Sequence, residues 1–320
     1  MKKSVVKWVV WGFLIQVGVA QALEEKVKPF KVGLWELSSQ FTGFNSDANY
    51  TANGGEYLSL IKGQRYSLYD LDLSARWNPN ARYGIFGDVV IASAQSQGVS
   101  ETRTNSSVSD VTLGIDYMLY KGWVQIVPEF SGSFPMTRIT PKTDGVMNSD
   151  GTMNGTFRIL FRRELPWVRF YTHFGYQYKD DGRASRLPYA LGAELDFNKT
   201  YLGFELGGFR SVSYDQDTNT PALKTTVTDR VNAGSLKFYS VNPSVMELKT
   251  WLAWDLAPYL SMNIGGGGTI NGENYAAGYQ FFAGITYRTI TLPKEKVSSP
   301  VDEFKPTPDP VTEKELKPGT

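Results

Sequence analysis

The chain contains no cysteine. This absence excludes a disulfide framework and also a lipid anchor of the lipoprotein type, which needs a cysteine after the leader. Lys and Arg together number 33 and Asp and Glu 32, and the main body shows neither a basic stripe nor an acidic block. Nucleic acid is therefore not expected as a partner.

The chain also lacks an apolar run long enough for a membrane-spanning helix, which needs about 20 residues. The longest run, Trp8 to Val19, follows the basic residues Lys2, Lys3 and Lys7 and precedes Ala20-Gln21-Ala22. This order is typical of a secretory signal peptide with a small-residue cleavage site. We predict a signal peptide at 1–22 and a short periplasmic segment at 23–31. If the mature chain enters a membrane, strands must cross it.

From Lys31 to about Leu292, apolar side chains alternate with polar or small ones. Between Tyr69 and Trp77, for example, every second residue is apolar, while Asp70 and Asp72 fall on the opposite face. A period of two is the signature of a β-strand with unlike faces. The pattern predicts strands at 32–41, 64–77, 82–95, 109–120, 122–134, 154–165, 167–178, 187–197, 200–213, 244–255, 259–268 and 275–290.

The connections alternate between tight and long. Turn residues predict tight connections at 78–80, 121–122, 165–166, 198–199 and 257–258. The intervening polar segments predict longer loops at 42–63, 96–108, 135–153, 179–186, 214–243 and 269–274. This asymmetry is typical of outer-membrane barrels, in which the short turns and, for an even strand count, both termini face the periplasm.

Aromatic residues cluster beside the tight turns, as expected for a membrane interface. They are Trp77, Tyr83, Tyr120, Trp123, Trp167, Tyr201, Trp254 and Tyr259. A soluble β-sandwich would also alternate, but its strands average five or six residues and its aromatics belong in the core. The sequence thus predicts an all-β fold, a transmembrane antiparallel up-and-down β-barrel of about 12 strands spanning residues 32–292.

With this architecture the segment from Lys31 to Leu292 resembles bacterial outer-membrane channels and porin-like proteins of intermediate size. The last strand carries Gly278 with Phe281 and Gly284 with Tyr287, but lacks the final aromatic residue usual in that group. The resemblance implies a bacterial outer-membrane location with extracellular long loops and periplasmic termini. It also implies outer-membrane lipid and the outer-membrane assembly machinery as partners.

The Pro-, Lys- and Glu-rich segment 293–320 lacks the apolar content to fold alone. We predict a disordered periplasmic tail, for which peptidoglycan or a periplasmic protein is a candidate partner.

Ionisable side chains on the polar strand face need water or partners. They predict a charged lumen, and hence a pore or transporter for small polar or ionic solutes. A structural or adhesive barrel with an ion-paired, occluded lumen remains the alternative. Arg158, Arg162 and Arg169 are expected to form a basic ladder facing acidic residues across the lumen. The lumen and selectivity candidates are Asp70, Asp72, Asp88, Asp116, Glu129, Arg158, Arg162, Arg169, His173, Glu194, Glu205, Glu247 and Lys249.

Catalysis is not expected, because His173 is the only histidine, lies in the middle of a strand and has no neighbouring nucleophile. Asp215 and Asp217 have the opening spacing of a calcium loop, but Thr220 and Thr226 replace its glycine and glutamate. No metal and no cofactor are therefore expected. The sequence leaves open whether the loops at 42–63, 135–153 and 214–243 fold inward or outward.

Overall fold

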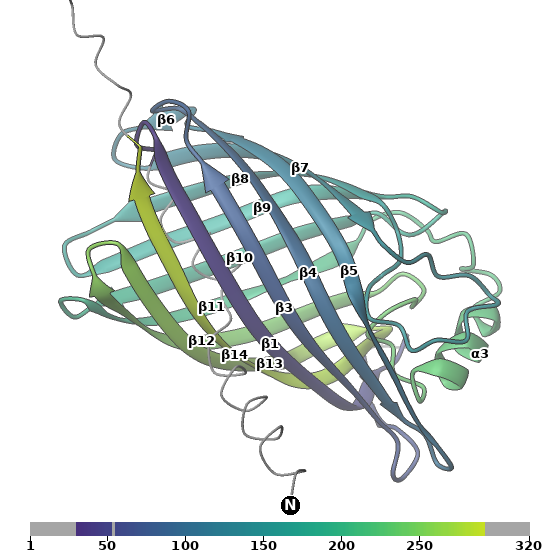
Figure 1. The fold of residues 1–320 in the computed structure, drawn as a ribbon. Helices are drawn as coiled ribbons and strands as arrows, with labels where there is room; N and C mark the ends of the chain where they lie inside the picture. Colours follow the sequence, from purple (N-terminus) through teal and green to yellow (C-terminus); the bar gives the residue numbers. More distant parts are fainter. Residues whose placement is uncertain (1–29, 53–54, 292–320) are drawn as a thin grey trace, which may run out of the picture.

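The computed structural model describes residues 30–52 and 55–291, and within them the chain forms an antiparallel β-barrel (Figure 1). Twelve long strands form the wall, and the short strands β2 (Tyr57–Ser59) and β6 (Tyr120–Lys121) extend it locally. The wall strands are β1 (Leu34–Tyr50), β3 (Arg65–Trp77), β4 (Tyr83–Gln97), β5 (Thr102–Tyr117), β7 (Gln125–Pro135), β8 (Asn154–Glu164), β9 (Val168–Lys179), β10 (Arg186–Asp196), β11 (Thr200–Ser211), β12 (Ser244–Ala257), β13 (Leu260–Glu273) and β14 (Tyr275–Ile290).

Each wall strand pairs with the next along the chain, and β14 returns to pair with β1, with Leu34 opposite Ile290 and Ala48 opposite Ala277. Closure leaves no sheet edge, which is the requirement for crossing a membrane with strands. The predicted all-β, twelve-strand, up-and-down barrel is confirmed. We call the end with connections 78–82, 122–124, 165–167, 197–199 and 258–259 the turn end, and the opposite end the loop end.

Three predicted loops are wrong. Most of 42–63 and 96–108 is strand, because β1 continues to Tyr50 and β5 begins at Thr102. The predicted loop 269–274 shrinks to Asn274, which adopts a positive φ of 48° between β13 and β14. The segments 42–50 and 102–108 are mostly polar or small, although Phe44 faces the interior, so they lack the regular apolar alternation of the wall near the turn end. They still form strands because backbone pairing to β3 and β4 satisfies their N–H and C=O groups.

The outer surface carries an apolar band. Leu113, Ile115, Phe130, Phe174 and Leu191 all point outward and are exposed. Such a surface is unfavourable in water and favourable in lipid. The same alternation that supplies this band sends the polar side chains inward.

The predicted aromatic belt is confirmed for most of its members. Trp77 stacks on Trp35 with ring centroids 5.7 Å apart, and Tyr83 lies 4.9 Å from Tyr117. Trp123, Trp167 and other belt residues are exposed at the turn end. Tyr201 is an exception, because its hydroxyl donates a hydrogen bond to Asp255 and its ring lies under Arg169.

Leu113→Arg should destabilise the barrel by about 2–4 kcal/mol, because it places a charge near the middle of the lipid-facing band. Leu113 is 60% exposed and lies four residues before the turn-end terminus of β5. Leu119→Arg is the matched control, since Leu119 is equally exposed but lies in the turn-end connection. It should cost about 0–1 kcal/mol. Urea unfolding in lipid vesicles measures both free energies, and equal costs would contradict the assigned membrane band.

The loop end is covered by two connections, 136–153 and 212–243, that fold inward. The second contains α3 (Ala222–Val231), which lies beside the barrel mouth in Figure 1. Val227 and Val231 of α3 pack with Met147 of the first connection. Val146 continues this packing onto Phe44, Tyr66 and Leu68 of the inner wall. The choice that the sequence left open is thus settled for both connections.

No helix among the described residues has the length and apolar content to cross a membrane. The predicted signal peptide, most of the short segment after it and the predicted tail lie outside the described residues.

Candidate functional site: the acidic lumen

The barrel interior encloses two adjoining cavities of about 400 and 300 Å³. Asp72 and Arg158 line both, so these two residues mark the junction. The cavities exist where the alternation supplies short or polar side chains, since strands of a twelve-stranded barrel lie farther apart across the lumen than those of a filled eight-stranded one.

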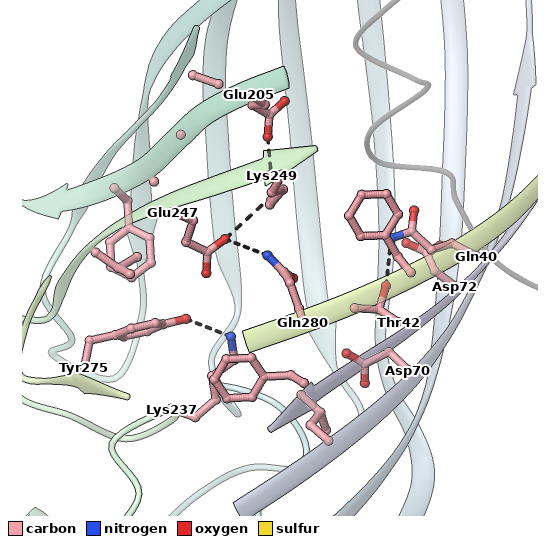
Figure 2. Close-up of a pocket in the computed structure, with 18 of the residues that line it drawn as sticks. Gln40, Thr42, Asp70, Asp72, Glu205, Lys237, Glu247, Lys249, Tyr275 and Gln280 are labelled. Carbon is pink, nitrogen blue, oxygen red and sulfur yellow. Dashed lines mark hydrogen bonds and ion pairs between the residues drawn. The ribbon is translucent and has the colours of Figure 1, made fainter. Parts of the chain in front are cut away.

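One wall of the larger cavity is acidic. Asp70 and Asp72 follow each other at a spacing of two on β3, so both point inward. Asp72 is only 6% exposed, and its Oδ1 has no hydrogen-bond partner among residues 30–52 and 55–291. On the neighbouring strand β1, the Gln40 amide donates to Thr42 Oγ1 at 2.7 Å (Figure 2).

Another wall, on β11, β12 and β14, holds a connected network (Figure 2). Lys249 Nζ lies 3.3 Å from Glu205 Oε1 and 3.7 Å from Glu247 Oε2. The Gln280 amide donates to the same Glu247 oxygen at 3.2 Å, and Tyr171 OH donates to Glu205 Oε2 at 2.7 Å. These carboxylates are therefore held in place, whereas the β3 pair faces the open volume.

The structure brings most of the predicted site residues to the cavities. The larger cavity is lined by Asp70, Asp72, Arg158, His173, Glu205, Glu247 and Lys249. The smaller is lined by Asp72, Asp88, Glu129 and Arg158. Their part in solute selection stays a prediction.

Asp116, Arg162, Arg169 and Glu194 lie outside the cavities, nearer the turn end. Arg76 Nη2 lies 2.6 Å from Asp116 Oδ1, with both side chains almost fully buried. Arg169 contacts Glu194 at 3.3 Å and Asp196 at 3.1 Å. The Trp251 indole also donates to Glu194. This half of the lumen is more strongly cross-linked by charge than the cavity half.

The expected basic ladder has a different geometry from the one predicted. Arg158 lies 2.6 Å from Glu129 on the adjacent strand β7, and Arg169 pairs with adjacent β10. Arg162 forms an ion pair with Glu164 of its own strand at 3.5 Å. These pairs run along the wall, because directly opposed residues of neighbouring strands lie only about 5 Å apart.

Sequence reasoning missed several lining residues. Thr156 lines the smaller cavity, lies two places before Arg158 and could have been found from the alternation of β8. Tyr275 and Gln280 of β14 flank a break in the alternation, since Tyr275, Ala276 and Ala277 are all buried. Lys237 reaches the cavity from the irregular connection 212–243. No periodic signal predicts the direction of such a side chain.

Among the described residues, no group of three or more His, Cys, Asp or Glu side chains is placed to hold a metal ion. No protein-family model matches the sequence. No curated protein matches it either.

Solved structures do show a likeness. The COG4313 outer membrane channel from Pseudomonas putida F1 aligns with a TM-score of 0.63 and 11% identity, covering 85% of this chain and 100% of that one. The chain has the fold of an outer-membrane β-barrel. The NanC porin aligns with a TM-score of 0.46 at 9% identity, and the KdgM porin with 0.44 at 10% identity. Each of these two alignments covers 78% of this chain and 98% of the porin chain.

The loop cover of this β-barrel is anchored by a half-buried carboxylate. Asp150 Oδ2 contacts both Lys179 of β9 and, at 3.0 Å, Arg186 of β10. Burial raises the pKa of Asp150, but Arg186 and Lys179 lower it by more, so the pKa lies well below its usual range. In the unfolded chain the pKa of this carboxyl group is about 4, so its lower pKa in the folded chain stabilises the fold at any pH above about 4. This stabilisation is lost as the pH falls through the folded-state pKa.

Asp150→Asn should loosen the connection 136–153 at neutral pH, because it leaves two cations close together without their anion. Trypsin should then cut at the exposed Lys142 severalfold faster than in the unaltered protein. The control is Asp181→Asn, because within the described part of the chain Asp181 makes only an exposed pair with Arg138 at 4.0 Å. Equal cleavage rates in the two variants would show that Asp150 does not hold the cover.

Proposed function

We propose that this chain is a narrow outer-membrane channel that passes small polar or ionic solutes and prefers cations. The observation that carries the proposal is the charge of the two adjoining cavities. Six carboxylates line them against three basic side chains, Arg158, Lys237 and Lys249. The six are Asp70, Asp72, Asp88, Glu129, Glu205 and Glu247.

An acidic lining raises the local concentration of cations, and low-dielectric walls strengthen the effect. The preference arises mainly on β3 and β4, because Glu129, Glu205 and Glu247 already lie beside basic groups. Asp70 and Asp72 have no ion pair within 4 Å among the described residues, so their carboxyl groups remain available to a solute.

In the proposed orientation the loop end is extracellular and the turn end periplasmic, as the alternation of tight and long connections supports. The described termini, Phe30 and Thr291, then lie at the periplasmic face beside the paired ends of β1 and β14. Contacts with the assembly machinery, and with peptidoglycan or a periplasmic protein through 293–320, remain predictions.

A structural barrel with an occluded lumen is the second candidate. It is favoured by the buried Arg76–Asp116 pair at the turn end and by the inward-folded connections at the loop end. The two candidates differ in one measurable respect, because only the channel requires ions to cross the barrel.

The test is uptake of labelled rubidium and labelled chloride into vesicles containing the refolded protein. We expect rubidium to enter faster, and Asp70→Asn with Asp72→Asn to lower the rubidium-to-chloride ratio severalfold. Asp47→Asn is the control, because this exposed carboxylate lies at the loop end outside both cavities. Uptake no faster than in protein-free vesicles would favour the structural barrel.

A further inference from the structure

The larger cavity already contains an ammonium group, supplied by Lys237. Its Nζ lies 4.0 Å from the centre of the Phe44 ring and 5.2 Å from that of Tyr275. The same Nζ donates a hydrogen bond to Tyr275 OH at 3.0 Å (Figure 2). Aromatic faces attract cations, and the attraction grows when the cation is removed from water.

The chain holds Lys237 in this position from both sides. Asn49 of β1 donates to the Gly234 carbonyl at 2.8 Å and accepts from the Leu236 N–H at 2.9 Å. On the other side, the Phe238 ring packs edge-on against Tyr66 at 6.3 Å. Lys237 therefore enters the cavity from an anchored segment, and its position is not that of a loosely attached surface side chain.

The surroundings of Lys237 favour its charged form. Burial lowers the pKa of Lys237, but Tyr275, Glu247 and Asp70 raise it by more, so the pKa lies above its usual value. Lys237 makes no ion pair within 4 Å with any described carboxylate, and Glu247 is engaged by Lys249 and Gln280. The ammonium is thus held by rings and by a diffuse negative field, without a fixed partner.

The cavity retains acceptor capacity beyond what Lys237 uses. Asp72 is more than nine-tenths buried, lines the cavity, and has an Oδ1 without a hydrogen-bond partner in the described part of the chain. A buried hydrogen-bond acceptor without a donor raises the free energy of the folded state, so a donor that enters the cavity can form a favourable hydrogen bond with Asp72 Oδ1. An ammonium brings three donors together with the opposite charge.

We propose that the larger cavity is a binding site for small primary ammonium compounds and that Lys237 is a tethered occupant of this site. A soluble ammonium would take the place of the Lys237 side chain between Phe44, Tyr275 and the acidic wall. When Lys237 is displaced, the connection 212–243 loses its contact with the cavity. The ammonium compound therefore binds more tightly when this connection has moved off the loop end of the barrel, and its binding favours that conformation. The link to solute passage rests on the proposed channel function, but the binding site does not.

The probe is n-butylammonium, which reproduces the end of a lysine side chain, and n-butanol is its neutral counterpart. Isothermal titration of the detergent-solubilised protein measures binding. We expect Lys237→Met to bind n-butylammonium at least about tenfold more tightly than the unaltered protein, because no internal competitor remains. Adding Asp72→Asn should remove this gain. Lys62→Met, at an exposed turn lysine, should change nothing.

A second measurement uses the unaltered protein and does not depend on the folding of a variant. n-Butylammonium should accelerate trypsin cleavage at the exposed Arg230 of α3, and n-butanol should not. Absence of binding in both the unaltered protein and Lys237→Met, or equal binding of the alcohol, would overturn the proposal. Ion passage without ammonium binding would leave the channel standing and remove the site. Ammonium binding without ion passage would support the binding site and contradict the channel function.

Discussion

A barrel in which residues 214–241 are replaced by a short Gly/Ser turn should admit small neutral sugars severalfold faster than the unaltered protein. The replacement removes α3, Lys237, which lies over the Phe44 ring, and Phe238, which packs against Tyr66. The wall should tolerate it, because Ser211 Oγ already donates to the Pro243 carbonyl at 2.6 Å, so β11 and β12 end side by side. Swelling of vesicles in arabinose measures the rate.

The matched control for this prediction is a replacement of the short loop-end connection at 98–101 between β4 and β5, which contributes nothing to the buried cluster of Met147, Val227, Val231 and Tyr239. It should leave the rate nearly unchanged. An equal rate for the control and the long-loop replacement would mean that the connection 212–243 does not limit passage, and the narrowest point would then have to lie in the ion-paired turn half.

Arg76→Ala should destabilise the barrel by about 3–5 kcal/mol, because it leaves the buried carboxylate of Asp116 without its cation. The pair is 2.6 Å long, and neither side chain is more than 4% exposed. Gly84 of β4 makes room for it, since a Cβ there would lie 2.2 Å from Arg76 Nη2 and 2.4 Å from Asp116 Oδ1. Urea unfolding in vesicles gives the free energy.

Two further variants separate the pair from a general charge effect. Arg103→Ala removes an exposed pair with Glu101 at the loop end and should cost at most about 1 kcal/mol. Replacing both members, Arg76→Met with Asp116→Leu, should recover most of the stability lost in Arg76→Ala, because no unpaired charge remains. A single variant as stable as the unaltered protein would contradict the assignment of a desolvated pair.

The wall of the barrel could be predicted because the direction of each side chain depends on its position within its own strand. A lipid-facing strand must alternate, so the pattern around Asp70 and Asp72 predicts their inward direction. The Gly265 to Gly268 run shows the same logic. A Cβ on Gly265 would lie 2.5 Å from the Phe282 ring, so the glycine makes space for an aromatic side chain inside the wall.

The parts that could not be predicted are those without a period. At the loop end, residues 42–50 and 102–108 are mostly polar or small, and it is their pairing with β3 and β4 that identifies them as strand. Lys237 belongs to this class too. Its direction depends on Asn49, which lies 188 positions away in sequence, and on packing against Tyr66. Pairing along the wall, as in Arg158 with Glu129, likewise depends on strand register.

The most direct test of the channel function is the current through single refolded barrels in a planar bilayer under a salt gradient. The acidic cavities predict a small, steady conductance with a reversal potential on the cation side, and they predict that Asp70→Asn with Asp72→Asn moves this potential toward zero. Silence from protein shown to be inserted, or a reversal potential on the anion side, would contradict the account.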